Sequence, residues 1–154
     1  MSDSNNHSIE RSVLIQAPRA RVWRALSDAQ EFGTWFGARF ESPRFEPGLK
    51  TRGNITFPGY EHVFFDIWIE RMDAPETFVY RWHPYAVDMA HDYSGEEPTT
   101  VTFTLKDAPG GATLLRVLES GFDKVPAERR EEAFRMNSGG WDGQMRNIAK
   151  HVAA

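Results

Sequence analysis

The segment from Pro126 to Val152 constrains the fold of this chain more than any other. Its apolar side chains recur every three, four or seven residues, which on a helix places them on one face. These side chains are Phe134, Trp141, Met145, Ile148 and Val152. No other segment has a helical pattern of this length, and at about 1.5 Å per residue the helix would be roughly 40 Å long. We therefore expect one long C-terminal helix that crosses the rest of the domain.

Two adjacent glycines, Gly139 and Gly140, lie in the middle of this predicted helix. Each glycine costs about 1 kcal/mol relative to alanine in a helix interior, so the pair calls for an explanation. One explanation is that the helix approaches the sheet closely there or bends mildly. The other is that the helix covers a cavity, in which case the indole of Trp141 is predicted to form part of the cavity wall.

Upstream of the helix the apolar pattern has a period of two, which is typical of strands. A first strand is predicted over residues 9–16, followed by a short helix that opens at Pro18 and a second that runs from the Ser27-Asp28 cap through Phe32. A run of about six strands then follows, with turn residues between ranges that include 49–57, 60–72, 77–83, 99–106 and 112–120. This order predicts an α+β domain over residues 9–154, with a bent antiparallel sheet around the long helix and a flexible tail over residues 1–8.

The composition argues against several functional classes. The 154 residues carry a formal net charge of -4 and no basic cluster larger than Arg129-Arg130, so neither nucleic acid nor an anionic membrane is expected as a partner. The absence of cysteine excludes disulfides, thiol catalysis and cysteine-bound metal. Because the sequence has neither a signal-peptide pattern nor a run of about 18 apolar residues, we expect a cytoplasmic protein.

The common catalytic and cofactor motifs are missing from the sequence, among them GxSxG, GxGxxG, the phosphate-binding P-loop and HExxH. His83, Asp88, His91 and Asp92 bring metal-ligand atoms to one stretch, but their spacing matches no metal motif. We therefore expect neither a metal nor a cofactor, and the sequence motifs assign no catalytic residue.

Two carboxylates fall on apolar strand faces. Glu119 shares its face with Leu115 and Val117, and Asp66 lies between two aromatic residues on its own face. A carboxylate in such a place is either paired or functional. The sequence leaves both alternatives open: a structural salt bridge or hydrogen bond from a neighbouring strand, or a functional carboxylate that acts as an acid or base.

Aromatic residues make up 13% of the sequence, more than the packing of one helix requires, although most are expected to be ordinary core. A sheet that closes around a helix need not fill its interior, and a partly empty aromatic chamber is a site for apolar ligands. The residues predicted to line such a cavity are Trp35, Phe36, Phe40, Asp66, Trp68, His83, Tyr93, Glu119, Asn137 and Trp141.

Several segments together resemble a known family. They are Ile9 to Gln16 with Ala17-Pro18, Val22-Trp23-Arg24-Ala25-Leu26, Trp35-Phe36, Pro47-Gly48, Arg81-Trp82-His83-Pro84 and Asn137-Ser138-Gly139-Gly140-Trp141. In these segments the chain resembles the activator of heat-shock protein 90 ATPase homologues, which belong to the START-like (SRPBCC) superfamily. The resemblance covers about residues 9 to 152 and implies the helix-grip fold, whose cavity holds hydrophobic small molecules in many relatives.

Three functions are compatible with these features, because one scaffold in this superfamily serves lipid carriers, hormone receptors, cyclases and chaperone regulators. The first is binding of a small, largely apolar molecule in a cavity between the sheet and the C-terminal helix. The second is a protein-interaction module that acts on a chaperone. The third is an enzyme of the cyclase or hydrolase kind that uses Asp66, Glu119 or His83 as its acid or base.

Overall fold

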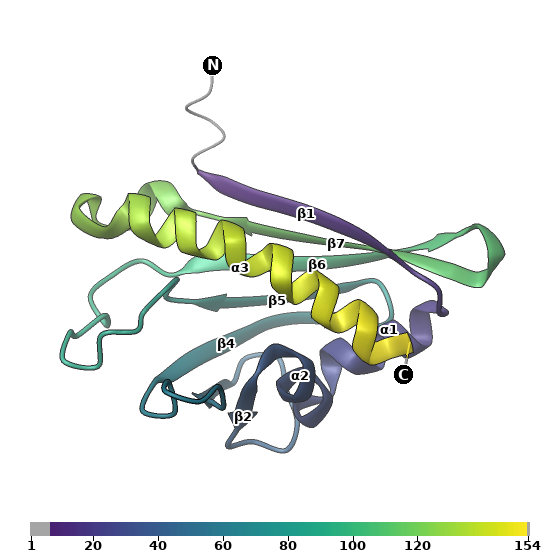
Figure 1. Cartoon of the computed structure of the whole chain (residues 1–154), viewed down its shortest axis with the longest axis horizontal. Coiled ribbons are helices and arrows are strands. Elements are labelled where there is room, and N and C mark those ends of the chain that lie inside the picture. The colour runs from purple at the N-terminus through teal and green to yellow at the C-terminus, as the bar shows by residue number, and fades with distance from the viewer. Residues whose placement is uncertain (1–6, 154) are drawn as a thin grey trace.

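A seven-stranded antiparallel sheet bends around the C-terminal helix in the computed structural model, which describes residues 7–153 (Figure 1). The elements follow in the order β1 (Ser8–Ile15), α1 (Arg19–Ser27), α2 (Ala29–Phe36), β2 (Ala38–Phe40), β3 (Lys50–Ile55), β4 (Phe64–Asp73), β5 (Thr77–Trp82), β6 (Thr99–Ala108), η2 (Pro109–Gly111), β7 (Ala112–Ser120), η3 (Phe122–Lys124) and α3 (Ala127–Ala153). The strand order in the sheet is β1-β7-β6-β5-β4-β3-β2, and every pair is antiparallel. Residues 1–6, most of the predicted tail, lie outside the described residues.

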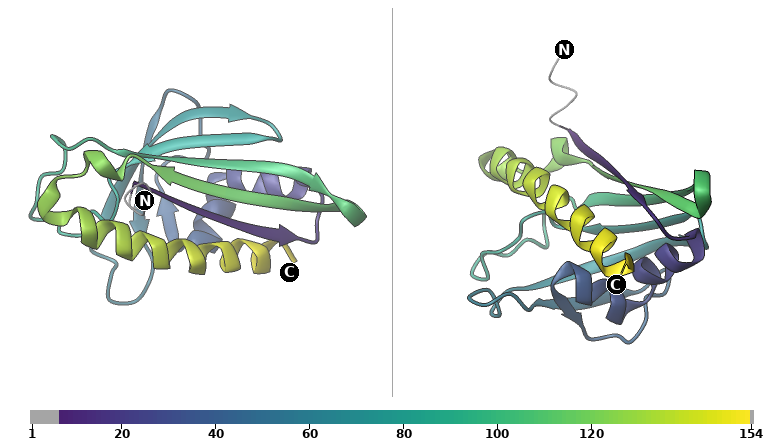
Figure 2. Two further views of the ribbon diagram at one scale, coloured as in Figure 1. Left: turned by 90° about the horizontal axis from the view of Figure 1, so that it is seen from above. Right: turned by 45° about the vertical axis from the view of Figure 1, so that its right-hand side comes forward.

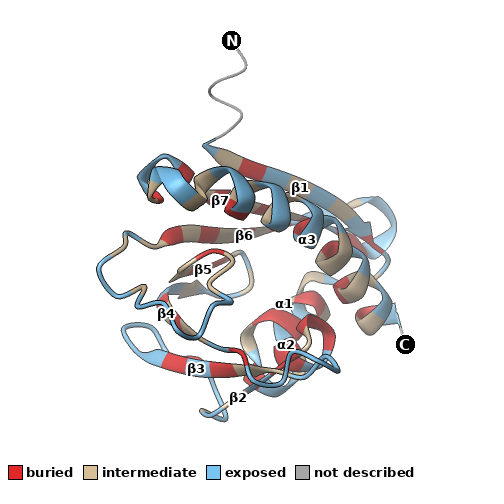
Figure 3. Cartoon of the chain, turned by 60° about the vertical axis from the view of Figure 1, so that its left-hand side comes forward, coloured by how far each residue is buried: buried red, intermediate tan, exposed pale blue. Residues whose placement is uncertain are grey.

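The long helix α3 confirms the prediction for residues 126–152 and runs along one side of the sheet (Figure 2). Of the five apolar residues predicted to share one face of this helix, four are buried, together with Ala133. The fifth, Phe134, packs edge-on against Phe122 of η3 at a centroid distance of 5.2 Å. Figure 3 shows buried segments on all three helices as well as along the strands, so the core lies between the sheet and the helices. Within residues 7–153, no helix combines the length and the apolar composition needed to cross a bilayer.

The glycine pair in α3 does not mark a close approach to the sheet. A Cβ atom added at Gly139 or at Gly140 would meet no heavy atom within 4 Å, and both residues are exposed. The explanation by close packing is therefore wrong. Neither glycine is required by its surroundings, and the helix continues through both positions.

The second short helix is longer than predicted, because Gly33, which was expected to follow its last residue, lies inside the helix. Helix α2 continues through Gly33 to Phe36 and ends at Gly37, whose φ of 93° is left-handed. A Cβ at Gly33 would lie 2.2 Å from the carbonyl oxygen of Ala38, so glycine lets β2 pass directly under the helix. The three-residue strand β2 itself was not predicted.

Glu31 connects the three helices. It lies in the first turn of α2, where its backbone N–H donates to the Asp28 cap, and its carboxylate contacts Arg21, Arg24 and His151 at 2.7–2.9 Å. Burial alone would raise the pKa of Glu31, but the hydrogen bonds from these three side chains outweigh it and lower the pKa from 4.5 to about 2. The carboxylate is therefore ionised at neutral pH and holds α1 and α3 to the start of α2.

Candidate functional site

Glu119 is a carboxylate in the centre of the core. It lies on the inner face of β7 with Leu115 and Val117, as the alternation predicted, and all three side chains are fully buried. Four donors surround it. They are Trp82 Nε1 at 2.8 Å and Thr99 Oγ1 at 2.5 Å to Oε2, and Trp141 Nε1 at 2.8 Å and Asn137 Nδ2 at 3.0 Å to Oε1.

These donors come from three different elements. Trp82 ends β5 and Thr99 begins β6, while Asn137 and Trp141 lie four residues apart on one face of α3. In all four contacts the carboxylate accepts the hydrogen bond. Among the described residues no basic side chain forms an ion pair with Glu119. Neutral donors therefore satisfy the buried carboxylate, which is the structural alternative that the sequence left open.

Tyr80 brings a second polar group into this part of the core. Its ring lies between the aromatic side chains of the core, and within residues 7–153 its hydroxyl has no hydrogen-bond partner. Burial raises the pKa of the Tyr80 phenol well above its usual value, and the charge of Glu119 raises it further. The phenol therefore keeps its proton as an unpaired donor.

An apolar cavity of about 540 Å³ lies between α2, α3 and the segments around β3, β4 and the end of β5. Its lining is almost entirely apolar and consists of Phe36, Ile55, Phe57, Pro58, Tyr60, Val63, Phe65, Trp82, His83, Tyr85, Ala86, Val87, Met136 and Asn137. Four of these residues are large apolar side chains exposed to solvent: Phe57 (51%), Tyr60 (59%), Val87 (38%) and Met136 (40%). They form an apolar rim where the cavity opens to solvent.

A smaller cavity of about 110 Å³ adjoins the large one. The two share Phe36, Trp82 and Asn137, and the smaller cavity adds Gly140, Trp141 and Gln144. Trp82, Asn137 and Trp141 are also donors to Glu119. The buried carboxylate therefore fixes, through hydrogen bonds, the three side chains that form the wall between the cavities and the core.

The structure brings some of the predicted lining residues together at these cavities. Phe36, His83 and Asn137 line the larger one, and Trp141 lines the smaller one beside Gly140. Glu119 lies behind the shared wall and lines neither cavity.

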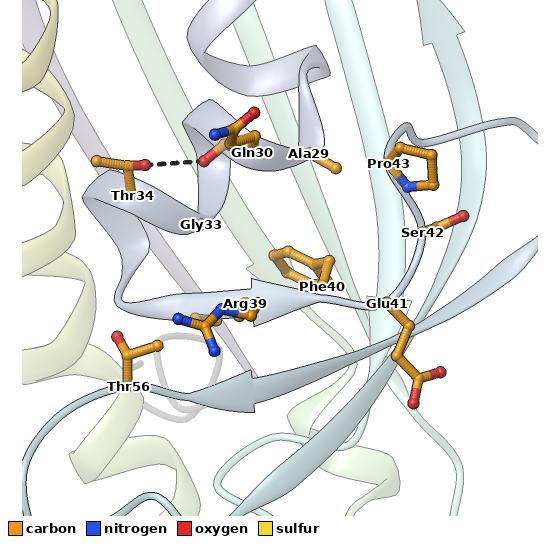
Figure 4. A pocket seen from close by; sticks show the side chains of 11 residues that line it. Ala29, Gln30, Gly33, Thr34, Arg39, Phe40, Glu41, Ser42, Pro43 and Thr56 are labelled. Atoms are coloured by element: carbon orange, nitrogen blue, oxygen red, sulfur yellow. Dashed lines mark hydrogen bonds between the residues drawn. The ribbon is translucent and has the colours of Figure 1, made fainter.

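Two predicted residues lie elsewhere, near α2. The indole N–H of Trp35 donates to the carbonyl of Ala25 at 2.8 Å, which fixes this side chain within the helical layer. Phe40 lies at a surface depression of about 580 Å³ between α2 and β2. Figure 4 shows this depression with the Phe40 ring over β2 and polar side chains around it, among them Thr34, which donates to the Gln30 carbonyl.

Asp66, Trp68 and Tyr93 lie at a separate groove of about 430 Å³. Asp66 and Trp68 alternate along β4 with the inward-facing residues Phe65 and Ile67, so they lie on the outer face of the sheet. For Asp66 and Trp68 the prediction of a cavity-facing position was wrong, because period two defines two faces without saying which one is concave. Tyr93 lies in the loop between β5 and β6 and lines the groove, not the apolar cavity.

The carboxylate of Asp66 is paired rather than buried among apolar groups. It contacts Arg52 at 3.0 Å and Lys50 at 4.0 Å on the neighbouring strand β3. His83 lines both the groove and the large cavity, and its ring lies edge-on to Trp68 at a centroid distance of 5.6 Å.

The loop of residues 84–98 forms a wall of both spaces and is fastened to the start of α3. Arg129 donates to Glu96 at 2.9 Å and to the Pro84 carbonyl at 2.8 Å, and its guanidinium lies 4.8 Å from the centre of the Tyr93 ring. Burial would raise the pKa of Glu96, but its hydrogen bonds from Arg129 and His91 lower it. In the described part of the chain, no group of three or more His, Cys, Asp or Glu side chains is arranged to hold a metal ion.

Neither Thr99 nor the apolar rim was among the predicted site residues. Thr99 meets Glu119 only through the register of β6 with β7 and the bend of the sheet, which no local pattern specifies. A signal for the rim was present, because an exposed turn with the sequence Phe57-Pro58-Gly59-Tyr60 is unusually apolar.

The bent antiparallel sheet, the long C-terminal helix and the two short helices after the first strand define a helix-grip domain. Within that class, residues 16–153 match the family described as Activator of Hsp90 ATPase homolog 1-like protein. The chain belongs to this family, which confirms the resemblance seen in the sequence.

Solved structures with the same fold cover nearly the whole chain. MLL2253 from Mesorhizobium loti is 20% identical, with a TM-score of 0.73 over 95% of this chain and 96% of that one. A protein from Arthrobacter aurescens is 18% identical, with a TM-score of 0.78 over 98% and 88%. DynU16, from the dynemicin biosynthetic locus, is 22% identical, with a TM-score of 0.71; the match covers 96% of this chain and 48% of DynU16, about half of its length. No functionally curated protein matches the sequence significantly.

Proposed function

We propose that this protein binds a small, largely apolar molecule in the cavity between the sheet and α3. The observation that carries the proposal is the 540 Å³ cavity with its apolar lining, a volume within the range of about 300–1,000 Å³ that is typical of small-molecule sites. Phe36, Trp82 and Asn137 are the proposed central contacts, with His83 at the edge and Trp141 behind the shared wall.

The exposed rim supports the same proposal. Single apolar side chains on a surface are ordinary, but Phe57, Tyr60, Val87 and Met136 gather at the mouth of one cavity. A bound apolar molecule would cover side chains that the protein alone leaves in water. The locus of DynU16 is a biosynthetic one, which is compatible with a fold that handles small molecules.

The other functions considered from the sequence have less support. All four acceptor positions of Glu119 are occupied by donors, and Asp66 is paired with Arg52, so neither carboxylate is free to act as an acid or base. Regulation of a chaperone rests on the family name alone. We retain a cytoplasmic location as part of the proposal.

An uncharged fluorescent probe, N-phenyl-1-naphthylamine, tests the proposed function. We expect saturable binding, quenching of tryptophan fluorescence, and a stabilisation of about 2.7 kcal/mol at a hundredfold excess over the dissociation constant. For a domain of this size that corresponds to a rise in melting temperature of roughly 5–10 °C.

A matched pair of variants locates the site. Met136 at the rim and Leu114 on the far side of the sheet are equally exposed, at 40% each. We expect Met136→Lys to weaken probe binding at least tenfold and Leu114→Lys to leave it unchanged. A wild-type protein that does not bind the probe, or two variants that weaken binding equally, would refute the proposal.

A further inference from the structure

Asn137 presents its two amide ends to different surroundings. A carboxylate that only accepts hydrogen bonds requires a donor, so the Nδ2 group must face Glu119, where it lies 3.0 Å from Oε1. The carbonyl oxygen Oδ1 is thereby turned away from Glu119. The side-chain hydrogen bond of Asn137 within residues 7–153 uses Nδ2, and Oδ1 is not among the buried unpaired atoms, so it is open to solvent where Asn137 lines both cavities.

The other polar side chains of the smaller cavity already have partners. The indole N–H groups of Trp82 and Trp141 both donate to Glu119. Gln144 donates to the Phe36 carbonyl at 2.9 Å and accepts from Asn147 at 3.0 Å. Asn137 Oδ1 is thus the side-chain oxygen left without a partner in the lining of this cavity.

We propose that Asn137 makes the site selective for apolar molecules that carry a hydrogen-bond donor, a hydroxyl or N–H group, which donates to Oδ1 at the junction of the two cavities. This inference rests on the proposed function and specifies its ligand class. An apolar molecule without a donor would displace water from Oδ1 and leave the oxygen unpaired, which a site of this kind penalises strongly. Glu119 is a positioning residue, because it fixes the direction of the amide without contacting the ligand.

Three probes with one skeleton test the selectivity: naphthalene, 1-naphthol and 1-methoxynaphthalene. The naphthol has a donor, the methyl ether has only an acceptor, and naphthalene has neither. For the wild-type protein, titration followed by tryptophan fluorescence is expected to show 1-naphthol binding at least tenfold tighter than 1-methoxynaphthalene.

Two substitutions assign the selectivity to Asn137. Asn137→Leu keeps a similar volume and is expected to bring the naphthol-to-ether ratio to about one. Thr99→Val is the control, because it also removes one donor from Glu119 but leaves Asn137 in place, and it is expected to keep the ratio. If Asn137→Leu does not fold, the side-chain amide resonances of wild-type Asn137 serve instead: at saturation they should shift differently with 1-naphthol, which donates to Oδ1, than with the ether, and equal shifts would overturn the selectivity.

The outcomes separate this inference from the proposed function. Equal binding of naphthol and ether to the wild-type protein, or a preference that survives Asn137→Leu, overturns the selectivity but leaves an apolar site. Failure of all three probes to bind overturns both.

Discussion

Replacement of Glu119 by glutamine tests whether the buried carboxylate organises the core. The side chain keeps its shape, but one of its two oxygens becomes an NH₂ group. The two indoles contact different oxygens, Trp82 at Oε2 and Trp141 at Oε1. Whichever way the new amide turns, its NH₂ group faces an indole N–H, and neither group can accept. The hydroxyl of Thr99 can adapt, because it can rotate and accept a hydrogen bond from the new NH₂ group. An indole N–H cannot accept, so the conflict with the indole remains.

The expected cost follows from these contacts. Losing one hydrogen bond to a charged acceptor costs about 1.5–3 kcal/mol, and an indole N–H left buried without a partner adds about 1–3 kcal/mol. Removing the buried charge returns part of this sum, because a neutral amide is easier to desolvate. We expect Glu119→Gln to lower the free energy of unfolding by about 2–4 kcal/mol.

Urea unfolding, followed by circular dichroism and tryptophan fluorescence, measures this change from the shift in midpoint. Glu10→Gln is the control. It makes the same chemical change on the exposed face of β1, where the carboxylate pairs with Arg116, and should cost less than about 1 kcal/mol.

A second variant tests the reason for the loss. Trp82→Phe removes one of the two conflicting donors, so the double variant Glu119→Gln/Trp82→Phe should lose less than the sum of the single losses. Strict additivity, or a loss below about 0.5 kcal/mol for Glu119→Gln alone, would refute the argument.

Three further predictions follow from side chains described above. Gly139→Ala should raise the free energy of unfolding by about 0.5–1 kcal/mol, because a Cβ there meets no other atom. Gly33→Ala should lower it by about 1–3 kcal/mol, because its Cβ would collide with the carbonyl oxygen of Ala38. Equal effects of the two variants in thermal melts would contradict this contrast. Tyr80→Phe should leave stability unchanged or raise it by about 1 kcal/mol, and a clear loss would mean that the hydroxyl has a partner. The contribution of Glu31 is fully present above pH 4.5 and lost as the pH falls through about 2, so wild type should lose about 1–3 kcal/mol more than Glu31→Gln over that range, as urea titrations at each pH would show.

The secondary structure could be predicted where local patterns decide it. The stripe of α3 and the strand β7, found with the predicted bounds of residues 112–120, depend on spacing that is visible in a short window. The end of α2 depends on something else, because the reason for Gly33 is the backbone of β2 passing beneath it. A glycine required by a tertiary contact and a glycine that stops a helix look the same in the sequence.

The site was harder to predict, because it depends on which face of each strand is concave. The alternation of period two placed Glu119 correctly on the inner face with Leu115 and Val117. The same reasoning predicted that Asp66 faces the cavity, but Asp66 lies on the outer face of the sheet. The partners of Glu119 are up to 37 residues away in the chain, and two of them, Asn137 and Trp141, meet it only when α3 lies on the sheet. The family resemblance supplied the helix-grip fold, but not these contacts.

The origin of Glu119's donors has a consequence for the order in which the protein assembles. During synthesis the strands emerge first, and at that stage Oε1 lacks both of its partners, since Asn137 and Trp141 belong to the last helix. A bare carboxylate cannot be sealed in an apolar interior, so water has to remain on the concave face of the sheet until α3 arrives. The nascent sheet therefore stays wet at its centre, and docking of the final helix and drying of the core become a single event.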